Sequence, residues 1–185
     1  MDLKNKSIMV DIEKCLACKG CEIACAVAHS DSKVLQEAVQ ELPKPQRRVT
    51  VQAAGEFAVP LQCRHCEDAP CIAVCPTGAI HREETDGPVL IEQDKCIGCK
   101  YCLVVCPFGV IEVSHDGKVM VKCDLCIERA RMGQEPACVE ACPTKALKLG
   151  SEKDLAAARR RHAALDLVSS TQKNKQKKKS KESAQ

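Results

Sequence analysis

The chain has 185 residues, a formal net charge of +3, 16 cysteines and 2% aromatic residues, with no tryptophan. Its length allows one globular domain or two small ones, but so few large side chains cannot by themselves build a sizeable core. We therefore expect disulfides or metal to hold the fold together.

The N-terminal stretch MDLKNKSIMVDIEKC carries charges throughout. It lacks the apolar region and small-residue cleavage site of a secretory signal, and it lacks the paired arginines of an export signal. No run approaches the roughly 18 apolar residues of a membrane span. These features predict a cytoplasmic protein. In a reducing cytoplasm, a dense cysteine framework indicates metal more often than disulfides.

The cysteines form an internal repeat that organises the whole sequence. They fall into four groups of four, and none of the 16 is left over. In chain order the groups are Cys15, Cys18, Cys21 and Cys25; Cys63, Cys66, Cys71 and Cys75; Cys96, Cys99, Cys102 and Cys106; and Cys123, Cys126, Cys138 and Cys142.

The spacing within the groups distinguishes iron–sulfur clusters from zinc. A structural zinc site takes two pairs of ligands separated by a longer loop. The third group instead reads CIGCKYCLVVCP, the run of bacterial ferredoxins, in which three close thiols wrap three corners of a cubane cluster. The second group inserts one residue before Cys71, and the fourth has a longer loop before Cys138. The sequence therefore predicts four 4Fe–4S clusters.

The fourth cysteine of each group is expected on a short helix that carries its thiol away from its own loop. In two-cluster ferredoxins this thiol binds the other cluster. Pro76, Pro107 and Pro143 each follow such a cysteine, and proline cannot continue the helix. Cys25 is followed by Ala26, so EIACAVAHS predicts a helix that runs on past the cysteine. We still expect Cys25 to exchange with a partner group.

Between the groups the sequence predicts strands, because three stretches show β-branched alternation. These are RRVTVQ (47–52), PVLIEQD (88–94) and KVMVKC (118–123), and the turns TDG (85–87) and HDG (115–117) precede the last two. Short helices and β-hairpins around clusters give an α+β fold of small ferredoxin-like units, which we expect over residues 1–150.

After Gly150 the composition changes. SEKDLAAARRRHAALDLV (151–168) is alanine-rich and opens with the capping signal Ser151…Asp154, which predicts a helix. This helix either packs on its own domain or serves in docking or self-assembly. Residues 169–185 are rich in lysine without any aromatic residue, which favours a basic flexible tail over a segment that binds nucleic acid or lipid.

The ordered groups resemble a known family through CRHCEDAPC in the second and CDLC…C…CP in the fourth. This family comprises the four-cluster electron-transfer subunits of molybdenum and tungsten oxidoreductases, formate dehydrogenases and hydrogenases. The first group, CLACKGCEIACAVAHS, is most similar to the iron–sulfur subunit of carbon monoxide dehydrogenase systems. The resemblance covers roughly residues 7–150.

The resemblance implies two nested ferredoxin-like units, whereas the spacing alone does not choose between nested and sequential exchange of the fourth ligand. In the nested arrangement the first group exchanges with the fourth, and the second with the third. The implied ligand sets are Cys15, Cys18, Cys21 and Cys142; Cys123, Cys126, Cys138 and Cys25; Cys63, Cys66, Cys71 and Cys106; and Cys96, Cys99, Cys102 and Cys75.

Four cysteines for each cluster leave no iron open to a substrate, so we expect electron transfer and no enzyme activity. The chain would relay electrons through four clusters between a catalytic oxidoreductase subunit and a second redox protein. By resemblance, the catalytic subunit is of carbon monoxide dehydrogenase, formate dehydrogenase, aldehyde oxidoreductase or hydrogenase type. The alternative is an iron–sulfur redox regulator or an enzyme acting on its own. No incomplete ligand set and no DNA-binding domain supports that alternative. His65 lies inside a cluster loop, where it can tune that cluster.

Overall fold

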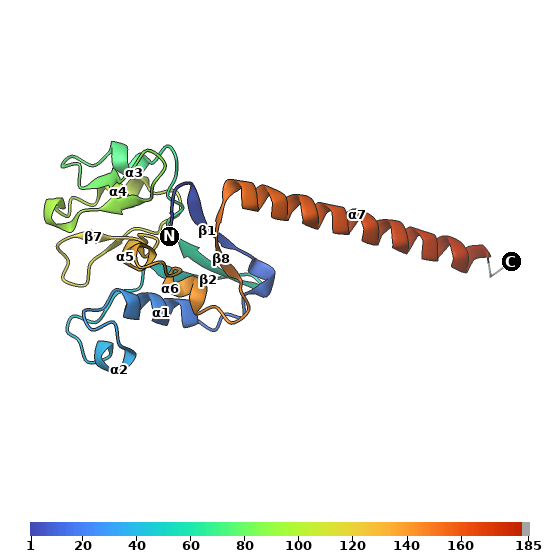
Figure 1. Ribbon diagram of the computed structural model, residues 1–185, viewed down its shortest axis with the longest axis horizontal. Coiled ribbons are helices and arrows are strands. Elements are labelled where there is room, and N and C mark those ends of the chain that lie inside the picture. Colours follow the sequence, from blue (N-terminus) through green and yellow to red (C-terminus); the bar gives the residue numbers. More distant parts are fainter. Residues whose placement is uncertain (183–185) are drawn as a thin grey trace. The chain divides into compact units, whose positions relative to one another are not determined.

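The computed structural model describes residues 1–182. The protein divides into a core unit, Met1–Leu149, and a C-terminal unit that begins at Gly150. The core unit combines short helices with small sheets, which confirms the α+β class (Figure 1). Within the described residues, no helix is both long and apolar enough to cross a membrane.

The strands of residues 1–182 form two-stranded sheets only. The β4–β5 and β6–β7 hairpins confirm the strand–turn–strand pattern expected around the turns TDG and HDG. The four pairs are β1 (Lys6–Val10) with β8 (Leu147–Ser151), β2 (Val49–Ala54) with β3 (Phe57–Gln62), β4 (Ile80–Arg82) with β5 (Val89–Ile91), and β6 (Glu112–Val113) with β7 (Met120–Val121).

The sequence predicts the β2–β3 hairpin only in part. It predicts a strand at 47–52, but it does not predict β3 as its partner. Pro60 lies within β3 and pairs with Val51 in an antiparallel register. A proline argues against a central strand because it cannot donate to the ladder. Here both strands are edges, so the missing donor is tolerated. Gly55, with a φ of 61°, turns the chain between the two strands.

Short helices lie next to the cysteine loops, and the third cysteine of each group lies inside one of them. An additional short helix, α2 (Leu35–Ala38), occupies the connection between the first and second groups. The others are η1 (Ile12–Lys14), α1 (Gly20–Ala28), α3 (Pro70–Ala73), η2 (Gln93–Lys95), α4 (Tyr101–Val105), α5 (Ile127–Arg131) and α6 (Ala137–Glu140).

The fourth cysteine of a group lies just past its helix wherever a proline follows it. Cys106 is the C-cap of α4 and is extended, with a ψ of 113°. Cys75 and Cys142 lie just beyond the C-caps of α3 and α6. A proline disfavours the helical conformation of the preceding residue, so these helices end before the cysteine rather than at the proline. Ala26 imposes no such limit, and α1 continues through Cys25 as predicted.

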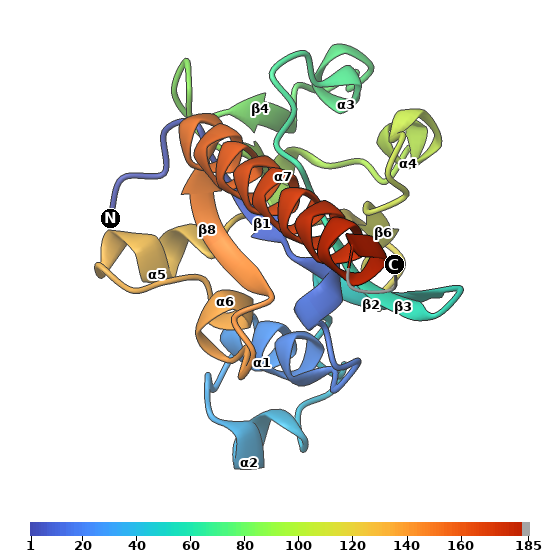
Figure 2. The same ribbon diagram turned by 90° about the vertical axis from the view of Figure 1, so that its right-hand side faces the viewer.

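The buried side chains of the core unit form two clusters, and cysteines belong to both. The larger contains cysteines of the first and fourth groups together with Cys63. The smaller contains Cys71 and Cys102, with Cys75, Cys96 and Cys106 packed against it. In agreement, α1 packs against α6 and α3 packs against α4 (Figures 1 and 2). The first group is therefore close to the fourth in space, and the second is close to the third.

The C-terminal unit is built around α7 (Glu152–Glu182). The N–H and the hydroxyl of Ser151 both donate to Oδ2 of Asp154 at 2.8 Å, so the predicted capping signal is confirmed. The helix extends beyond 168 because no glycine or proline follows Gly150 and lysine and glutamine favour helix. The flexibility expected of 169–185 stays a prediction, and 183–185 lie outside the described residues.

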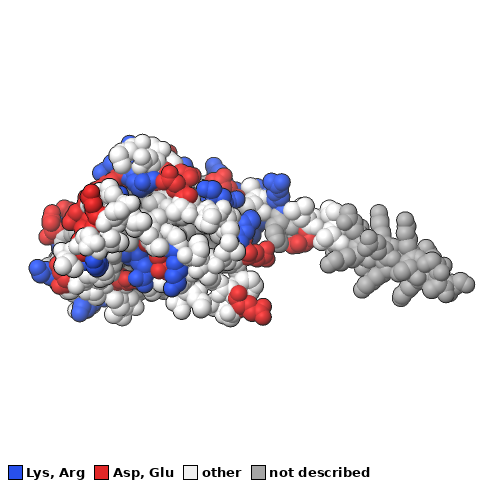
Figure 3. All heavy atoms as spheres, turned by 90° about the horizontal axis from the view of Figure 1, so that it is seen from below, with Lys and Arg blue, Asp and Glu red and all other residues white. Residues whose placement is uncertain are grey.

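Charged side chains of the core unit are mixed in sign. On the face in Figure 3, lysine and arginine side chains lie interspersed with aspartate and glutamate. Several are paired, as in Lys4–Glu84 and Arg131–Glu83. That face therefore lacks the single-sign patch on which nucleic-acid binding relies.

Candidate metal centres

One cavity brings the first three cysteines of the first group together with the last cysteine of the fourth. We call its four thiols, Cys15, Cys18, Cys21 and Cys142, the Cys15 set. Val51, Pro60 and Leu147 supply apolar walls of the cavity. Cys21 is buried on α1, whereas Cys18 is exposed.

A second cavity joins the second and third groups in the same way. It is lined by the Cys63 set, which comprises Cys63, Cys66, Cys71 and Cys106. The thiols of Cys66 and Cys71 each interact electrostatically with those of Cys63 and Cys106. Val89 and Phe108 also line this cavity.

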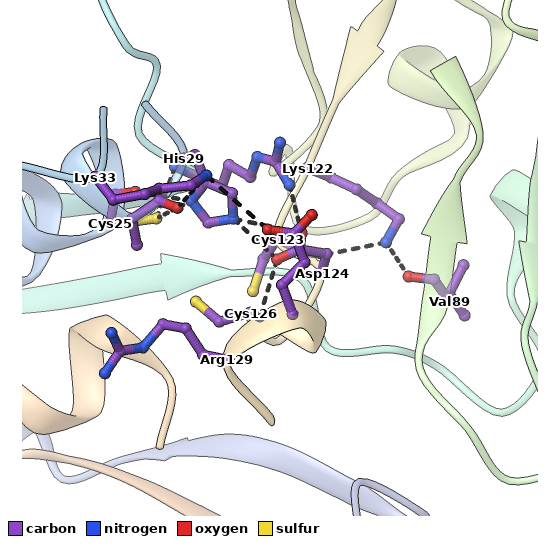
Figure 4. A network of polar contacts seen from close by, with 12 residues as sticks. Cys25, His29, Lys33, Val89, Lys122, Cys123, Asp124, Cys126 and Arg129 are labelled. Atoms are coloured by element: carbon purple, nitrogen blue, oxygen red, sulfur yellow. Dashed lines mark hydrogen bonds and ion pairs between the residues drawn. The ribbon is translucent and has the colours of Figure 1, made fainter. Parts of the chain in front are cut away.

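Four further thiols converge beside α1 and α6. We call Cys25, Cys123, Cys126 and Cys138 the Cys123 set, and all four are buried. Cys138 interacts electrostatically with Cys25 and Cys126, and Cys123 interacts with Cys25 and Cys138. Three of them, with Cys25 on a different segment from Cys123 and Cys126, are seen in Figure 4.

The remaining four are Cys75, Cys96, Cys99 and Cys102, the Cys96 set. Cys102 interacts electrostatically with Cys96 and Cys99. Cys75 packs against the same buried residues as Cys96 and Cys102. The loop needs glycine at Gly98, since its φ is +65° and a Cβ atom there would lie 2.3 Å from the carbonyl oxygen of Lys118.

Backbone N–H groups point at several of these thiols. The N–H groups of Arg48, His65 and Met120 donate to the sulfurs of Cys25, Cys63 and Cys96, at 3.2, 3.4 and 3.5 Å. Hydrogen bonds to sulfur stabilise a thiolate and raise the reduction potential of a cluster bound to it.

Burial controls the proton affinity of the inner thiols. It raises the pKa of Cys21 and Cys102 to about 11 and that of Cys25 to about 12. Burial alone would also raise the pKa of Cys142. Hydrogen bonds from the N–H groups of Leu147 and Ala146 and from the hydroxyl of Thr144 outweigh this effect, so the pKa of Cys142 is lowered. Because only the thiolate binds metal, the buried thiols require a strongly bound cation to lose their protons.

These donor sets fit iron–sulfur clusters. Each contains four sulfur atoms and no carboxylate or imidazole, which is the ligand chemistry of a cubane with cysteine at every iron. In each set three cysteines come from one group and the fourth comes from another. A cubane held by such a set would have cysteine at every iron.

A polar network supports the Cys123 set (Figure 4). The Nε2 of His29 donates to Asp124 at 3.1 Å, and Arg48 donates to the same carboxylate at 2.6 Å. Burial alone would raise the pKa of Asp124, but His29 and Arg48 outweigh it and hold the pKa well below its usual value. His29, Asp124 and Cys126 lie within 4.8 Å of one another. Since their polar atoms already have these partners, the group is a support for the thiols rather than a separate metal site.

Sequence reasoning missed three residues of this region: Arg48, Lys122 and Asp124. Asp124 lies between Cys123 and Cys126, and its Oδ1 accepts a local hydrogen bond from the N–H of Cys126 at 2.9 Å. Arg48 reaches Asp124 from far along the chain, so no local pattern reveals it. The burial of Lys122 could have been predicted, because alternation in KVMVKC places it on the same face as the buried Met120.

Comparison with known proteins identifies the family. Residues 55–152 match the model of the 4Fe-4S dicluster domain. An iron-sulfur protein of Rhodospirillum rubrum is 46% identical over 159 residues, covering 79% of this chain and 82% of the relative. The thiosulfate reductase electron transfer subunit PhsB of Salmonella typhi is 39% identical over 150 residues, covering 80% and 77%.

A further relative is a polypeptide of the anaerobic dimethyl sulfoxide reductase of Escherichia coli (strain K12). It is 36% identical over 173 residues, which cover 86% of this chain and 78% of the relative. The cysteine loops, the α+β fold and these relatives agree. The protein therefore belongs to the family of 4Fe–4S electron-transfer subunits of oxidoreductases.

Proposed function

We propose that this chain relays electrons through four 4Fe–4S clusters held by the Cys15, Cys123, Cys63 and Cys96 sets, with the fourth ligands exchanged in nested pairs. The observation that carries this proposal is the pair of cavities whose linings mix groups: Cys142 with the Cys15 loop, and Cys106 with the Cys63 loop. If the first group exchanged its fourth cysteine with the second group instead, Cys75 would lie with the Cys15 loop and Cys25 with the Cys63 loop.

When bound, such clusters supply one-electron oxidation and reduction without transfer of atoms. The chain's own residues do the rest. Cysteine thiolates fix each position, four per set, so no site remains for substrate. Buried apolar side chains lie beside the sets: Leu125 lies between Cys123 and Cys126, Ile111 lines the Cys63 cavity and Leu147 lines the Cys15 cavity. On this basis the subunit is not itself catalytic, and the alternative of an independent enzyme or regulator has no observation in its favour.

Contacts between sets support an order for the relay. Cys21 interacts electrostatically with Cys138, which links the Cys15 and Cys123 sets. Cys71 interacts with Cys102, which links the Cys63 and Cys96 sets. Lys122 precedes Cys123 and interacts with Cys71, which joins the two middle sets. We infer the order Cys15, Cys123, Cys63, Cys96.

Exposure supports the same order. Of the cysteines, Cys18 and Cys99 are the exposed ones, and they belong to the two outer sets. Leu16 beside Cys18 is 69% exposed, and Ile97 beside Cys99 is 67% exposed. Exposed apolar residues next to a terminal cluster are suited to contact with another protein. We infer that the two partners, a catalytic subunit and a second redox protein, dock at these ends.

The catalytic partner is proposed to be a reductase-type oxidoreductase subunit, because relatives serve thiosulfate and dimethyl sulfoxide reductases. The carbon monoxide dehydrogenase, formate dehydrogenase, aldehyde oxidoreductase and hydrogenase types come from the resemblance of the cysteine groups alone. Purification of the native complex and identification of the bound subunit by mass spectrometry would decide among them.

Metal analysis tests the relay directly. Protein purified without oxygen should contain about sixteen iron and sixteen acid-labile sulfide atoms for each chain, since each cubane holds four of each. Spin quantification of the fully reduced protein should account for four clusters. Zinc in place of iron, or about eight iron atoms, would contradict four clusters even if the protein transferred electrons.

We also propose that α7 binds a partner subunit or a second copy of the chain. Leu155, Leu165 and Val168 are exposed on it. Helices in proteins are stabilised mainly by packing, so these exposed apolar residues are suited to contact with another surface. Residues 1–150 would then act as the cluster-binding core and 151–168 as the docking segment.

Truncation tests this role of α7. A chain ending at residue 150 should keep its full iron content. It should lose co-purification with its partner, or lose self-association measured by light scattering. The triple change of Leu155, Leu165 and Val168 to alanine keeps the helix length and should show the same loss. Loss of iron on truncation would place the segment in the core instead.

A further inference from the structure

Lys122 is a buried cation without a carboxylate partner. Its side chain is 3% exposed. Its Nζ donates to the carbonyl oxygen of Val89 and, at 3.0 Å, to that of Cys123 (Figure 4). Among the described residues, no aspartate or glutamate forms an ion pair with it. Burying a charge is costly unless opposite charge lies near, so the position calls for an anionic group other than a carboxylate.

The nearest candidates are the two middle thiol sets. Lys122 directly precedes Cys123 in the chain, and it interacts electrostatically with Cys71 of the Cys63 set. A cubane with four thiolates carries a net charge of about −2. The ammonium group is therefore placed between two sites of negative charge, where it offsets their mutual repulsion.

His65 is a second buried donor in the same region. It is 8% exposed, and its Nδ1 accepts a hydrogen bond from the N–H of Val89 at 3.0 Å. The ring proton must then lie on Nε2. That nitrogen is buried and has no hydrogen-bond partner among the described residues. A buried N–H is costly to leave unpaired, so this one also calls for an acceptor.

The loop around His65 indicates which acceptor is at hand. His65 lies between Cys63 and Cys66, and its own backbone N–H donates to the sulfur of Cys63 at 3.4 Å. His65 and Lys122 interact electrostatically with each other. Cys63 and Cys66 are thus the thiols nearest to His65 along the chain, and sulfur at the Cys63 set would be an acceptor of the kind that Nε2 lacks.

Val89 fixes both donors at once. Its N–H holds the ring of His65, and its carbonyl oxygen holds Nζ of Lys122. Val89 is 1% exposed, is the first residue of β5, and lines the cavity of the Cys63 set. One peptide segment of a hairpin therefore sets the positions of two positively polarised groups beside the middle of the relay.

We propose that Lys122 and His65 raise the reduction potentials of the two middle clusters, Lys122 by its charge and His65 by a hydrogen bond from Nε2 to cluster sulfur. This inference rests on the proposed four-cluster relay. Positive charge and donors near cluster sulfur stabilise the reduced state, which carries one more electron. The pair lowers the cost of placing an electron between two anionic neighbours.

Redox titration followed by electron paramagnetic resonance tests the charge of Lys122. Lys122→Met should make two of the four midpoint potentials more negative and leave the other two at wild-type values. Lys122→Arg should restore them. Lys118→Met is the matched control, because its side chain is 80% exposed on the same segment and water screens it. Four unchanged potentials in Lys122→Met with full iron content would overturn the proposal.

A second variant tests the same charge in case Lys122→Met fails to fold. If Lys122→Met loses iron, Lys122→Gln keeps a donor for the two carbonyls without the charge. Lower potentials for two clusters in that variant support the proposal, and unchanged potentials overturn it. Failure of the relay itself shows separately, since wild-type protein would then hold fewer than four clusters.

Pulsed electron paramagnetic resonance tests the hydrogen bond of His65. In protein labelled with ¹⁵N-histidine, a reduced cluster should show coupling to a histidine nitrogen. His29 also contacts a thiol, since its Nδ1 lies 3.7 Å from Sγ of Cys25, so the measurement is made in a His29→Phe background. There His65→Phe should abolish the coupling, whereas His81→Phe, a change in the half-buried strand β4, should preserve it. Coupling that persists after His65→Phe in this background, or that is absent before it, would overturn the role of His65.

Discussion

Replacing Cys25 with alanine should remove the cluster of the Cys123 set and leave the cluster of the loop in which Cys25 lies. Cys25 is 4% exposed on α1 and interacts electrostatically with Cys126, Cys123 and Cys138. The thiols of Cys15, Cys18 and Cys21 instead share a cavity with Cys142. Iron should fall by about a quarter, to roughly twelve atoms for each chain.

Two double variants make this result decisive. Iron losses from two changes at one cluster should not add, whereas losses from changes at two different clusters should add. Under nested exchange, Cys25→Ala with Cys138→Ala should lose no more iron than either change alone. Cys25→Ala with Cys21→Ala should lose about half of the iron, since two clusters of about four iron atoms each are affected. Ligand sets confined to single groups would give the opposite pattern. Anaerobic iron and sulfide analysis, with spin quantification, distinguishes the two patterns.

The cysteine loops show how much local spacing can reveal. Each cysteine group spans only 11 to 20 residues of sequence, and the hairpins at TDG and HDG are equally local, so sequence reasoning finds them. The proximity of distant groups is not local: Cys142 lies near Cys15 where α6 packs against α1 and β8 pairs with β1. The nested sets were implied by family resemblance, since spacing gives no information on which distant loops meet.

Long-range polar contacts explain the residues that were missed. Arg48 reaches Asp124 and Lys122 reaches Val89, across separations of 76 and 33 residues. Lysine side chains usually face solvent, so the burial of Lys122 just after β7 follows from packing of the hairpins. In β3, the pairing of Pro60 with Val51 likewise depends on the partner strand, because proline by itself disfavours a strand.

Removing the clusters should unfold the core unit. The larger group of buried residues contains Cys21, Cys25, Cys63, Cys123, Cys138 and Cys142, so the proposed iron ligands make up much of its interior. The remaining elements are weak alone. A two-stranded hairpin is marginal in water, and helices of four to nine residues such as α3 and α1 lie below the length at which a helix persists.

Hydrogen exchange measured by mass spectrometry checks this expectation. In iron-free protein kept reduced, amides of α1 and of the β2–β3 hairpin should exchange at the rate of an unfolded chain. All 16 thiols should react rapidly with an alkylating reagent. Reconstitution with iron and sulfide should restore protection, whereas zinc should not, because a single tetrahedral ion cannot replace a cubane. Lasting protection of α1 without iron would contradict the expectation.

Neutral thiols could in principle keep the iron-free core folded, but their packing stabilises the fold far less than metal binding does. Burial raises the pKa of Cys25 to about 12, so without iron the inner cysteines stay neutral and can pack as small apolar residues. Their packing contributes little, since each side chain is small and removal of four cubanes would leave voids that cost free energy. Metal binding in small thiolate domains stabilises the fold by on the order of 10 kcal/mol, which is comparable to the entire stability of a typical domain. With one tyrosine, two phenylalanines and no tryptophan, the chain has no apolar reserve to replace that stabilisation, so the fold depends on the clusters it carries.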